Sequence, residues 1–356
     1  MKFYYLFTSV TFLQLYIPIA KYAWNVHGIS SVFIKKKSLK EYADPTHKDN
    51  RKLIEKTLKH LPFVSMVDIS DSILETKGVF FVVDGDIYGQ RKIFVRDSNV
   101  TKINKKSYIV SLQEHMNFVW AYDKFINDVS VCVFPNKHLA KYYNKMSEKN
   151  VYLGNTKFDD IHEDKNVIYD KFGLDKNTKW CLFLFPRETF MKQLGIPFSK
   201  TKTLIDIIQN TIGMKVVVKY RPKDIKMFDI KYDLSQYKCV VSDSYPNQSI
   251  ELMTVCDLCV MFSSSCIDEC IITKTPCMDC IIDYDDCKKM EYLVNERTLQ
   301  KIPKWENKSS EDIKEIYTRM AKPDDPIFES IKNEYLFDLN TSSNRIVEYV
   351  LKHNCI

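Results

Sequence analysis

The chain has 356 residues, 45% of them hydrophobic and only eight of them glycine, so it can form two globular domains and contains no low-complexity tract. Its net charge of +6 is mild and lysine is mixed with acidic residues throughout, which excludes the basic footprint of a nucleic-acid-binding protein. Eleven cysteines, an odd number spread through apolar segments, indicate free thiols in a reducing compartment.

The N-terminal stretch 1–24 is apolar enough to be considered as a signal anchor. Polar residues and Pro18 interrupt it, however, and it contains no run of 18 apolar residues. A strand at 3–7 followed by a helix at about 12–26 explains the stretch better, and no other segment could span a membrane. We therefore expect a soluble, cytoplasmic protein without a transmembrane segment.

Short apolar runs alternate with helical segments through the first half of the chain, which is the pattern of a doubly wound parallel sheet. The next expected strands are 31–34, 64–69, 78–83, 108–112, 129–134 and 151–153. The next expected helices are 51–60, 118–127 and 137–146.

The pattern restarts after a polar stretch at 162–179. The expected strands of this second half are 180–185, 215–219, 239–241, 258–262 and 278–282, and a closing helix is expected at 343–352. The sequence therefore predicts an α/β protein with two Rossmann-like parallel-sheet domains, an N-terminal one at 1–165 and a C-terminal one at 166–335. Because such sheets bind ligands at the carboxyl ends of their strands, we expect the site in a cleft between the domains.

Three serines, Ser263, Ser264 and Ser265, end the apolar strand 258–262 and precede a short helix. Backbone N–H groups and hydroxyls at such a helix start suit a phosphate. Glu269, one turn further along the helix, could reach a sugar hydroxyl. The alternative is a serine N-cap in front of a core helix.

Basic residues lie at the ends of two earlier strands in the same half. Arg187 follows the strand 180–185, and Lys219 and Arg221 lie at the end of the strand 215–219. These three cations could neutralise a diphosphate leaving group. The sequence has no Gly-x-Gly-x-x-Gly or Walker loop, which excludes dinucleotide-binding and P-loop proteins.

Acidic residues follow two strands of the first half. Asp84 and Asp86 come after the strand 78–83, where they could hold a metal-bridged diphosphate, supply a base or simply form a turn. Glu114 and His115 come after the strand 108–112, and either side chain could take a proton from an acceptor hydroxyl.

Four cysteines have the spacing of a zinc ribbon: Cys256, Cys259, Cys277 and Cys280. Both Cys-x-x-Cys pairs lie in or beside expected buried strands, where cysteine serves as a small hydrophobic residue. A helix must also fit between the pairs. We therefore favour free thiols and expect no metal site.

Three segments carry a family resemblance: 154–159 (Gly-Asn-Thr-Lys-Phe-Asp), 263–276, and 342–346 (Ser-Ser-Asn-Arg-Ile). The second matches without gaps a Ser-Gly-Gly-Ile-Gln-Glu-Glu-Ala segment and its trailing proline. On these residues the chain resembles the GT-B fold superfamily of UDP-N-acetylglucosamine 2-epimerase-like proteins and glycosyltransferases. The resemblance implies that the three serines bind a diphosphate, that Glu269 binds the nucleotide ribose, and that the segment 336–356 crosses back to the first domain.

The chain departs from the epimerases at positions that matter for their chemistry. Val10 and Leu15 stand where epimerases have an arginine and a lysine, and the family histidine is missing from the segment around Arg187. Asp86 and Glu114 do fall where epimerase acids fall. The loss of the cations and the histidine argues against epimerisation.

The sialyltransferases and other transferases of the superfamily are more similar. They have a Ser-Ser phosphate turn, and Arg221-Pro222 stands where they have His-Pro. An arginine in place of the histidine favours purely electrostatic stabilisation of the leaving group.

We therefore expect a metal-independent GT-B glycosyltransferase that moves a sugar from a nucleotide-sugar donor to a hydroxyl of a glycan or other acceptor. Asp86, Glu114 or His115 would act as the base, and inversion is expected if one base acts directly. No cofactor is expected beyond the donor substrate, and a homodimer is one arrangement that we consider. The alternatives are a 2-epimerase-like enzyme, a glycerophosphotransferase-like enzyme and an inactive sugar-binding module.

Overall fold

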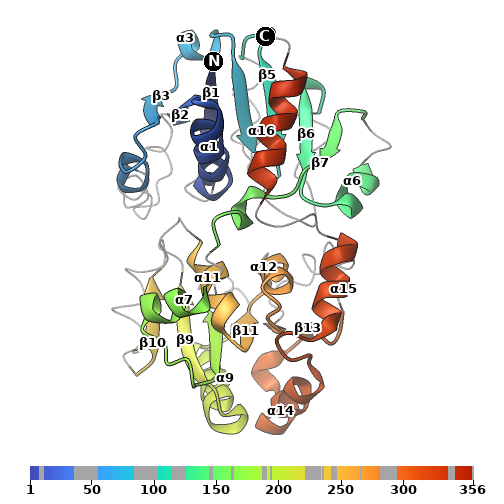
Figure 1. Cartoon of the computed structure of the whole chain (residues 1–356). Coiled ribbons are helices and arrows are strands. Elements are labelled where there is room, and N and C mark those ends of the chain that lie inside the picture. The colour runs from blue at the N-terminus through green and yellow to red at the C-terminus, as the bar shows by residue number, and fades with distance from the viewer. Residues whose placement is uncertain are drawn as a thin grey trace. The chain divides into compact units, whose positions relative to one another are not determined.

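The computed structural model describes the following residues: 1–7, 12–35, 55–83, 103–113, 126–143, 147–161, 164–186, 191–192, 195–220, 234, 236–241, 247–264, 266–280, 295–335 and 341–354 (Figure 1). The chain forms two compact units. The first contains Met1–Asp160 and Tyr335–Ile356, and the second contains Ile161–Asp243 and Asn247–Glu334.

In the described residues, the first unit has a seven-stranded sheet with the order β3-β2-β1-β4-β5-β6-β7, and all neighbouring strands are parallel. The strands are β1 (Lys2–Phe7), β2 (Ser30–Lys35), β3 (Val64–Asp68), β4 (Val79–Val83), β5 (Tyr108–Leu112), β6 (Val131–Phe134) and β7 (Asn150–Tyr152). The helical elements are α1 (Leu13–His27), α3 (Asp71–Leu74), η4 (Ile126–Asp128), α6 (Lys137–Tyr143), η5 (Thr156–Phe158) and α16 (Ser342–His353), and residues 55–59 are also helical.

The central strands of the first sheet are buried on both faces, as is typical of a parallel sheet. All five residues of β4 are buried. On one face, the ring of Tyr5 stacks on Phe33 and Phe81 with centroid distances of 4.8 and 4.9 Å. α1 and α16 cover this face and contribute to its core.

The N-terminal residues form β1 and α1, as the sequence predicts. α1 contains Pro18, and its residues 15–20 are all buried. It ends at Gly28, whose φ of +64° lets the chain leave the helix in the left-handed conformation. None of the helices in the described ranges combines the length and the apolar character needed to cross a membrane.

The segment 154–159 joins the last helix to the first sheet. Asp159 accepts hydrogen bonds from the N–H groups of Ser342 at 3.2 Å and Ser343 at 2.6 Å, in the first turn of α16. Gly154 has a φ of +96°, and a Cβ at this position would collide with the Ser342 hydroxyl. Glycine therefore permits the close approach, and the Asp159 carboxylate satisfies N–H groups that a helix start leaves unpaired.

Further contacts complete this joint between distant parts of the chain. Arg345 donates from Nε to the Leu153 carbonyl at 3.1 Å, and Thr156 donates from Oγ1 to the Leu15 carbonyl at 2.6 Å. α16 lies beside α1 in Figure 1, and Ile346 and Val350 are buried in the core that α1 shares. The segments 154–159 and 342–346 are thus two sides of one structural contact.

In the described residues, the second unit has a six-stranded sheet with the order β10-β9-β8-β11-β12-β13, again with all neighbours parallel. The strands are β8 (Trp180–Leu184), β9 (Lys215–Tyr220), β10 (Lys238–Val241), β11 (Leu258–Met261), β12 (Cys277–Cys280) and β13 (Leu299–Ile302). The helical elements are α7 (Lys165–Phe172), α9 (Phe198–Ile207), η6 (Ile208–Ile212), α11 (Gln248–Val255), α12 (Ile267–Ile272), η9 (Trp305–Asn307), α14 (Ser310–Arg319) and α15 (Pro326–Tyr335).

The second unit contains elements that the sequence does not predict, among them α7 and β13. The polar stretch at 162–179 contains α7, which buries only Ile168 and Phe172 and so has a weak apolar pattern. Its boundaries are nevertheless marked, since Asp164 caps the start and Gly173 ends the helix with a φ of +59°. β13 was not predicted, because only its first and last residues are fully buried.

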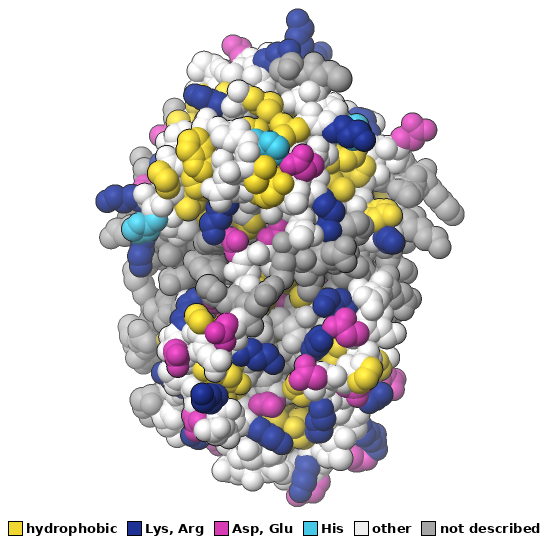
Figure 2. All heavy atoms as spheres, in the orientation of Figure 1, with side chains coloured by type: hydrophobic (Ala, Val, Ile, Leu, Met, Phe, Trp, Pro, Cys, Tyr) yellow, Lys and Arg dark blue, Asp and Glu magenta, His cyan; other side chains and the backbone are white. Residues whose placement is uncertain are grey.

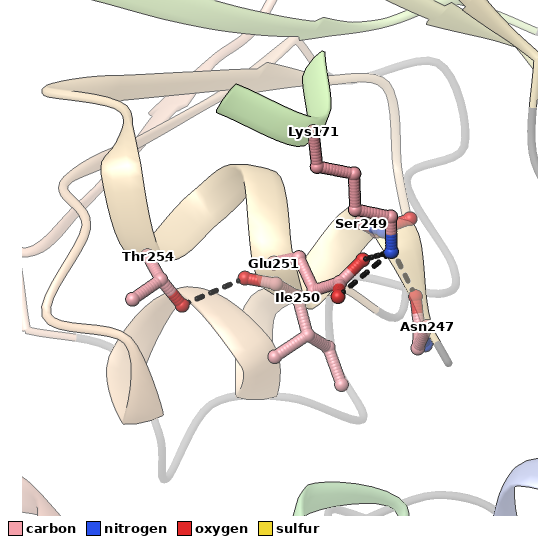
Figure 3. Close-up of polar contacts among 6 residues, drawn as sticks. All are labelled: Lys171, Asn247, Ser249, Ile250, Glu251 and Thr254. Carbon is pink, nitrogen blue, oxygen red and sulfur yellow. Dashed lines mark hydrogen bonds and ion pairs between the residues drawn. The ribbon is translucent and has the colours of Figure 1, made fainter. Parts of the chain in front are cut away.

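A buried ion pair explains how the polar helix α7 packs on α11. Lys171 Nζ lies 2.9 Å from Oε1 and 2.6 Å from Oε2 of Glu251, as Figure 3 shows. Glu251 is 1% exposed, so its charge requires a cation beside it. The pair fixes α7 at the position where the second unit begins.

We expect Asp159→Ala to lower the free energy of unfolding by about 1–2 kcal/mol, because it removes the carboxylate that caps α16. Urea denaturation measures the loss. Asp160→Ala is the matched control: Asp160 pairs with Lys21 at 2.8 Å, but both side chains are about one-third exposed, so the pair contributes about 1 kcal/mol or less. Equal losses in the two variants would contradict the capping role of Asp159.

Candidate functional site

Two of the predicted serines form a constrained turn between β11 and α12. Ser263 has a φ of +43°, which is in the left-handed region, and its N–H donates to Oδ1 of Asp279 at 2.7 Å. The hydroxyl of Ser264 accepts a hydrogen bond from the N–H of Cys266 at 3.3 Å. We call Ser263 and Ser264 the serine turn. Two side-chain acceptors, Asp279 on β12 and Ser264 within the turn itself, fix its conformation.

Two charged side chains predicted for the site, Lys219 and Glu269, both affect the thiol of Cys266, which follows the serine turn. Burial and, to a smaller extent, the charge of Glu269 raise the pKa of the Cys266 thiol to about 12. The Ser264 hydroxyl and the charge of Lys219 oppose this rise. Lys219 and Glu269 are each 6% exposed. The charges of Lys219 and Glu269 thus both act at Cys266, whose N–H donates to the Ser264 hydroxyl.

The strand order explains why these residues meet. β8 lies between β9, which carries Lys219, and β11, which leads into the serine turn. In the register, Leu184 pairs with Lys219 and Phe183 pairs with Val260, so the three strands end at a similar level. The chain also reverses its direction of winding between β8 and β11, and ligands bind at such topological switch points in α/β sheets.

The other predicted site residues lie outside the described part of the chain. They are Arg187, Arg221 and Ser265 in the second half, and Asp84, Asp86, Glu114 and His115 in the first half. The roles assigned to them remain predictions. The cleft expected between the domains likewise remains a prediction.

Asp279 contacts the serine turn, although the sequence does not predict it as a site residue. It lies on β12, is 2% exposed, and accepts the Ser263 N–H. Burial raises its pKa to about 7, while the Ser263 N–H and the charge of Lys301 oppose the rise. The available signal was a lone acidic residue in a strand expected to be buried, which is an uncommon position for a carboxylate.

The cysteines with zinc-ribbon spacing are buried and occur as free thiols: Cys256, Cys259, Cys277 and Cys280. Cys259 and Cys277 pair in register on the adjacent strands β11 and β12. In the part of the chain that the structure describes, no group of three or more His, Cys, Asp or Glu side chains could hold a metal ion. The structure therefore gives the zinc alternative no support.

The surface charges are mixed in sign. Figure 2 shows the coloured lysine, arginine, aspartate and glutamate side chains interspersed over the face in view. The coloured side chains of this face therefore form no broad basic surface.

Comparison with known proteins identifies the fold. No protein-family model and no curated protein matches the chain. Among solved structures, S. aureus MnaA with UDP is similar at 14% identity and a TM-score of 0.58, over 100% of this chain and 97% of that one. UDP-GlcNAc 2-epimerase from Neisseria meningitidis bound to UDP-GlcNAc is similar at 12% identity and a TM-score of 0.61, over 99% and 100% of the chains.

A third similar structure is a variant of the wall teichoic acid polymerase TagF soaked with CDPG, at 11% identity and a TM-score of 0.61, over 99% of this chain and 89% of that one. Together the three structures confirm the predicted fold class: α/β, GT-B-like, with two Rossmann-like parallel sheets.

We expect Asp279→Asn to change how stability depends on pH. Because the pKa of Asp279 is raised in the folded protein, its protonation stabilises the fold at low pH, and this contribution is lost as the pH rises through about 7. Between pH 5 and pH 8 the wild-type protein should therefore lose about 2–3 kcal/mol more of its free energy of unfolding than the variant. Urea denaturation at each pH tests this, and parallel pH profiles would contradict it.

Proposed function

We propose that the protein is a glycosyltransferase that moves a sugar from a nucleotide-sugar donor to an acceptor hydroxyl. The observation that carries the proposal is the convergence of Lys219, the serine turn and Glu269 at the carboxyl edge of the second sheet, beside its switch point. Similar structures support the donor class, since they contain UDP or UDP-GlcNAc.

In this proposal the second unit binds the donor. Lys219 and the predicted cations Arg187 and Arg221 neutralise the diphosphate, and the serine turn donates hydrogen bonds to it. Glu269 accepts hydrogen bonds from the ribose hydroxyls. The diphosphate leaves with the electron pair of its bond to the anomeric carbon, and these cations stabilise the charge that develops on it.

The predicted groups of the first half complete the reaction. Asp86, Glu114 or His115 removes the proton of the acceptor hydroxyl as its oxygen forms the new bond to the anomeric carbon. A single direct displacement of the diphosphate by this oxygen inverts the configuration at the anomeric carbon. The proposal needs neither a metal ion nor a further cofactor.

A second candidate is transfer of a phospho-polyol from a CDP-activated donor. The likeness to TagF soaked with CDPG favours it, and the same serine turn and cations would serve its phosphates. Epimerisation is less well supported, because Val10 and Leu15 replace the two cations of the epimerases.

The test is donor turnover. The purified protein is incubated with UDP-, CMP-, GDP-, dTDP- and CDP-activated donors, with and without EDTA, and the nucleotide released is measured by mass spectrometry. We expect slow release from one nucleotide-sugar, unchanged by EDTA. Release from the CDP-polyol alone would select the second candidate, and conversion of the sugar without nucleotide release would select an epimerase.

We expect Glu269→Gln to weaken binding of the accepted nucleotide about 10- to 100-fold, because a buried carboxylate that accepts hydrogen bonds contributes about 1.5–3 kcal/mol. Calorimetric titration measures the affinity. Glu315→Gln in α14 is the matched control, since Glu315 is exposed and lies in the same unit. Unchanged affinity in Glu269→Gln would remove Glu269 from the donor site.

A further inference from the structure

Ser263 adopts a conformation that a serine rarely takes. Its φ of +43° is in the left-handed region, where a non-glycine residue is disfavoured about tenfold or more in population. The conformation persists only if the surrounding structure holds it. Ser263 leads directly into Ser264 and the start of α12, so whatever holds Ser263 also determines where those groups lie.

Asp279 lies against this residue. Its Oδ1 accepts the Ser263 N–H at 2.7 Å, which is the length of a charge-assisted hydrogen bond. Asp279 pairs in register with Met261 on β11, two residues before Ser263. It is 2% exposed, so water does not compete for the bond.

The surroundings of Asp279 support its acceptor role. Lys301 on β13 pairs with it in register, and its positive charge favours the ionised carboxylate. Cys259 on β11 has the opposite effect, since its charge raises the pKa of Asp279. A carboxylate in the middle of an otherwise apolar strand is costly to bury unless it has hydrogen-bond partners, and Oδ1 of Asp279 has the Ser263 N–H as a partner.

We propose that Asp279 is the positioning residue of the serine turn. By accepting the Ser263 N–H it keeps Ser263 left-handed, and it thereby keeps the Ser264 hydroxyl and the first turn of α12 in the arrangement that receives the donor phosphates. The consequence for the donor rests on the proposed function. The effect on the turn does not, and the two can be measured separately.

The first experiment measures amide hydrogen exchange at Ser263 without nucleotide. Asp279→Leu removes the acceptor at similar volume, and we expect Ser263 to exchange at least tenfold faster. Asp279→Asn keeps an oxygen at the same position and should retain most of the protection. The Cys259 amide, which donates to the Pro276 carbonyl at 2.9 Å, is the control and should remain protected in both variants.

Unchanged exchange at Ser263 in Asp279→Leu would overturn the inference. Loss of protection at both amides would mean that the variant disturbs the sheet as a whole. Asp279→Ala then decides the matter, because it removes the acceptor without placing a larger apolar side chain in the sheet. Fast exchange at Ser263 with protection at Cys259 in that variant supports a specific role, and any other result counts against it.

The second experiment measures the affinity for the nucleotide that the donor test identifies. We expect Asp279→Leu to weaken binding about tenfold in the wild-type background. Glycine reaches the left-handed region without help, so in a Ser263→Gly background the same substitution should cost only about two- to threefold. Equal losses in both backgrounds would overturn the positioning role. A wild-type protein that binds no nucleotide would refute the proposed function, and the exchange result would still decide whether Asp279 holds the turn.

Discussion

A parallel sheet that is covered on both faces has little room for polar side chains except where its strands end. This constraint determines where each unit of the protein can place polar functional groups. The strands β4, β6 and β11 are buried along their whole length. Polar groups of the second unit accordingly gather at the carboxyl edge, in Lys219 and the serine turn. Two buried carboxylates away from these groups, Asp279 within β12 and Glu251 within α11, each have a specific partner, Ser263 and Lys171.

The motifs that carry the family resemblance divide into two kinds once the structure is considered. The segments 154–159 and 342–346 bind each other and join α16 to the first unit through Asp159 and Gly154. These two segments therefore have a structural role. The segment after β11 is different, because it places the serine turn and Glu269 at the edge of a sheet, where a ligand can bind.

The positions of most strands along the chain could be predicted because buried parallel strands give short apolar runs with clear boundaries. α7 and β13 could not, since each buries few residues and depends on contacts from distant segments, such as the pair between Lys171 and Glu251. In the site, Lys219, Ser264 and Glu269 were predicted from their positions at strand ends and a helix start. Asp279 required the structure, because its role depends on the neighbouring strand and on the left-handed conformation of Ser263.

The most direct test of the account is a crystal structure of the protein with the nucleotide that it binds. The account predicts phosphate oxygens within hydrogen-bonding distance of Ser264 and of Lys219 Nζ, and ribose hydroxyls at the Glu269 carboxylate. A nucleotide bound elsewhere, or one whose ribose does not reach Glu269, would contradict the assignment of the second sheet edge as the donor site.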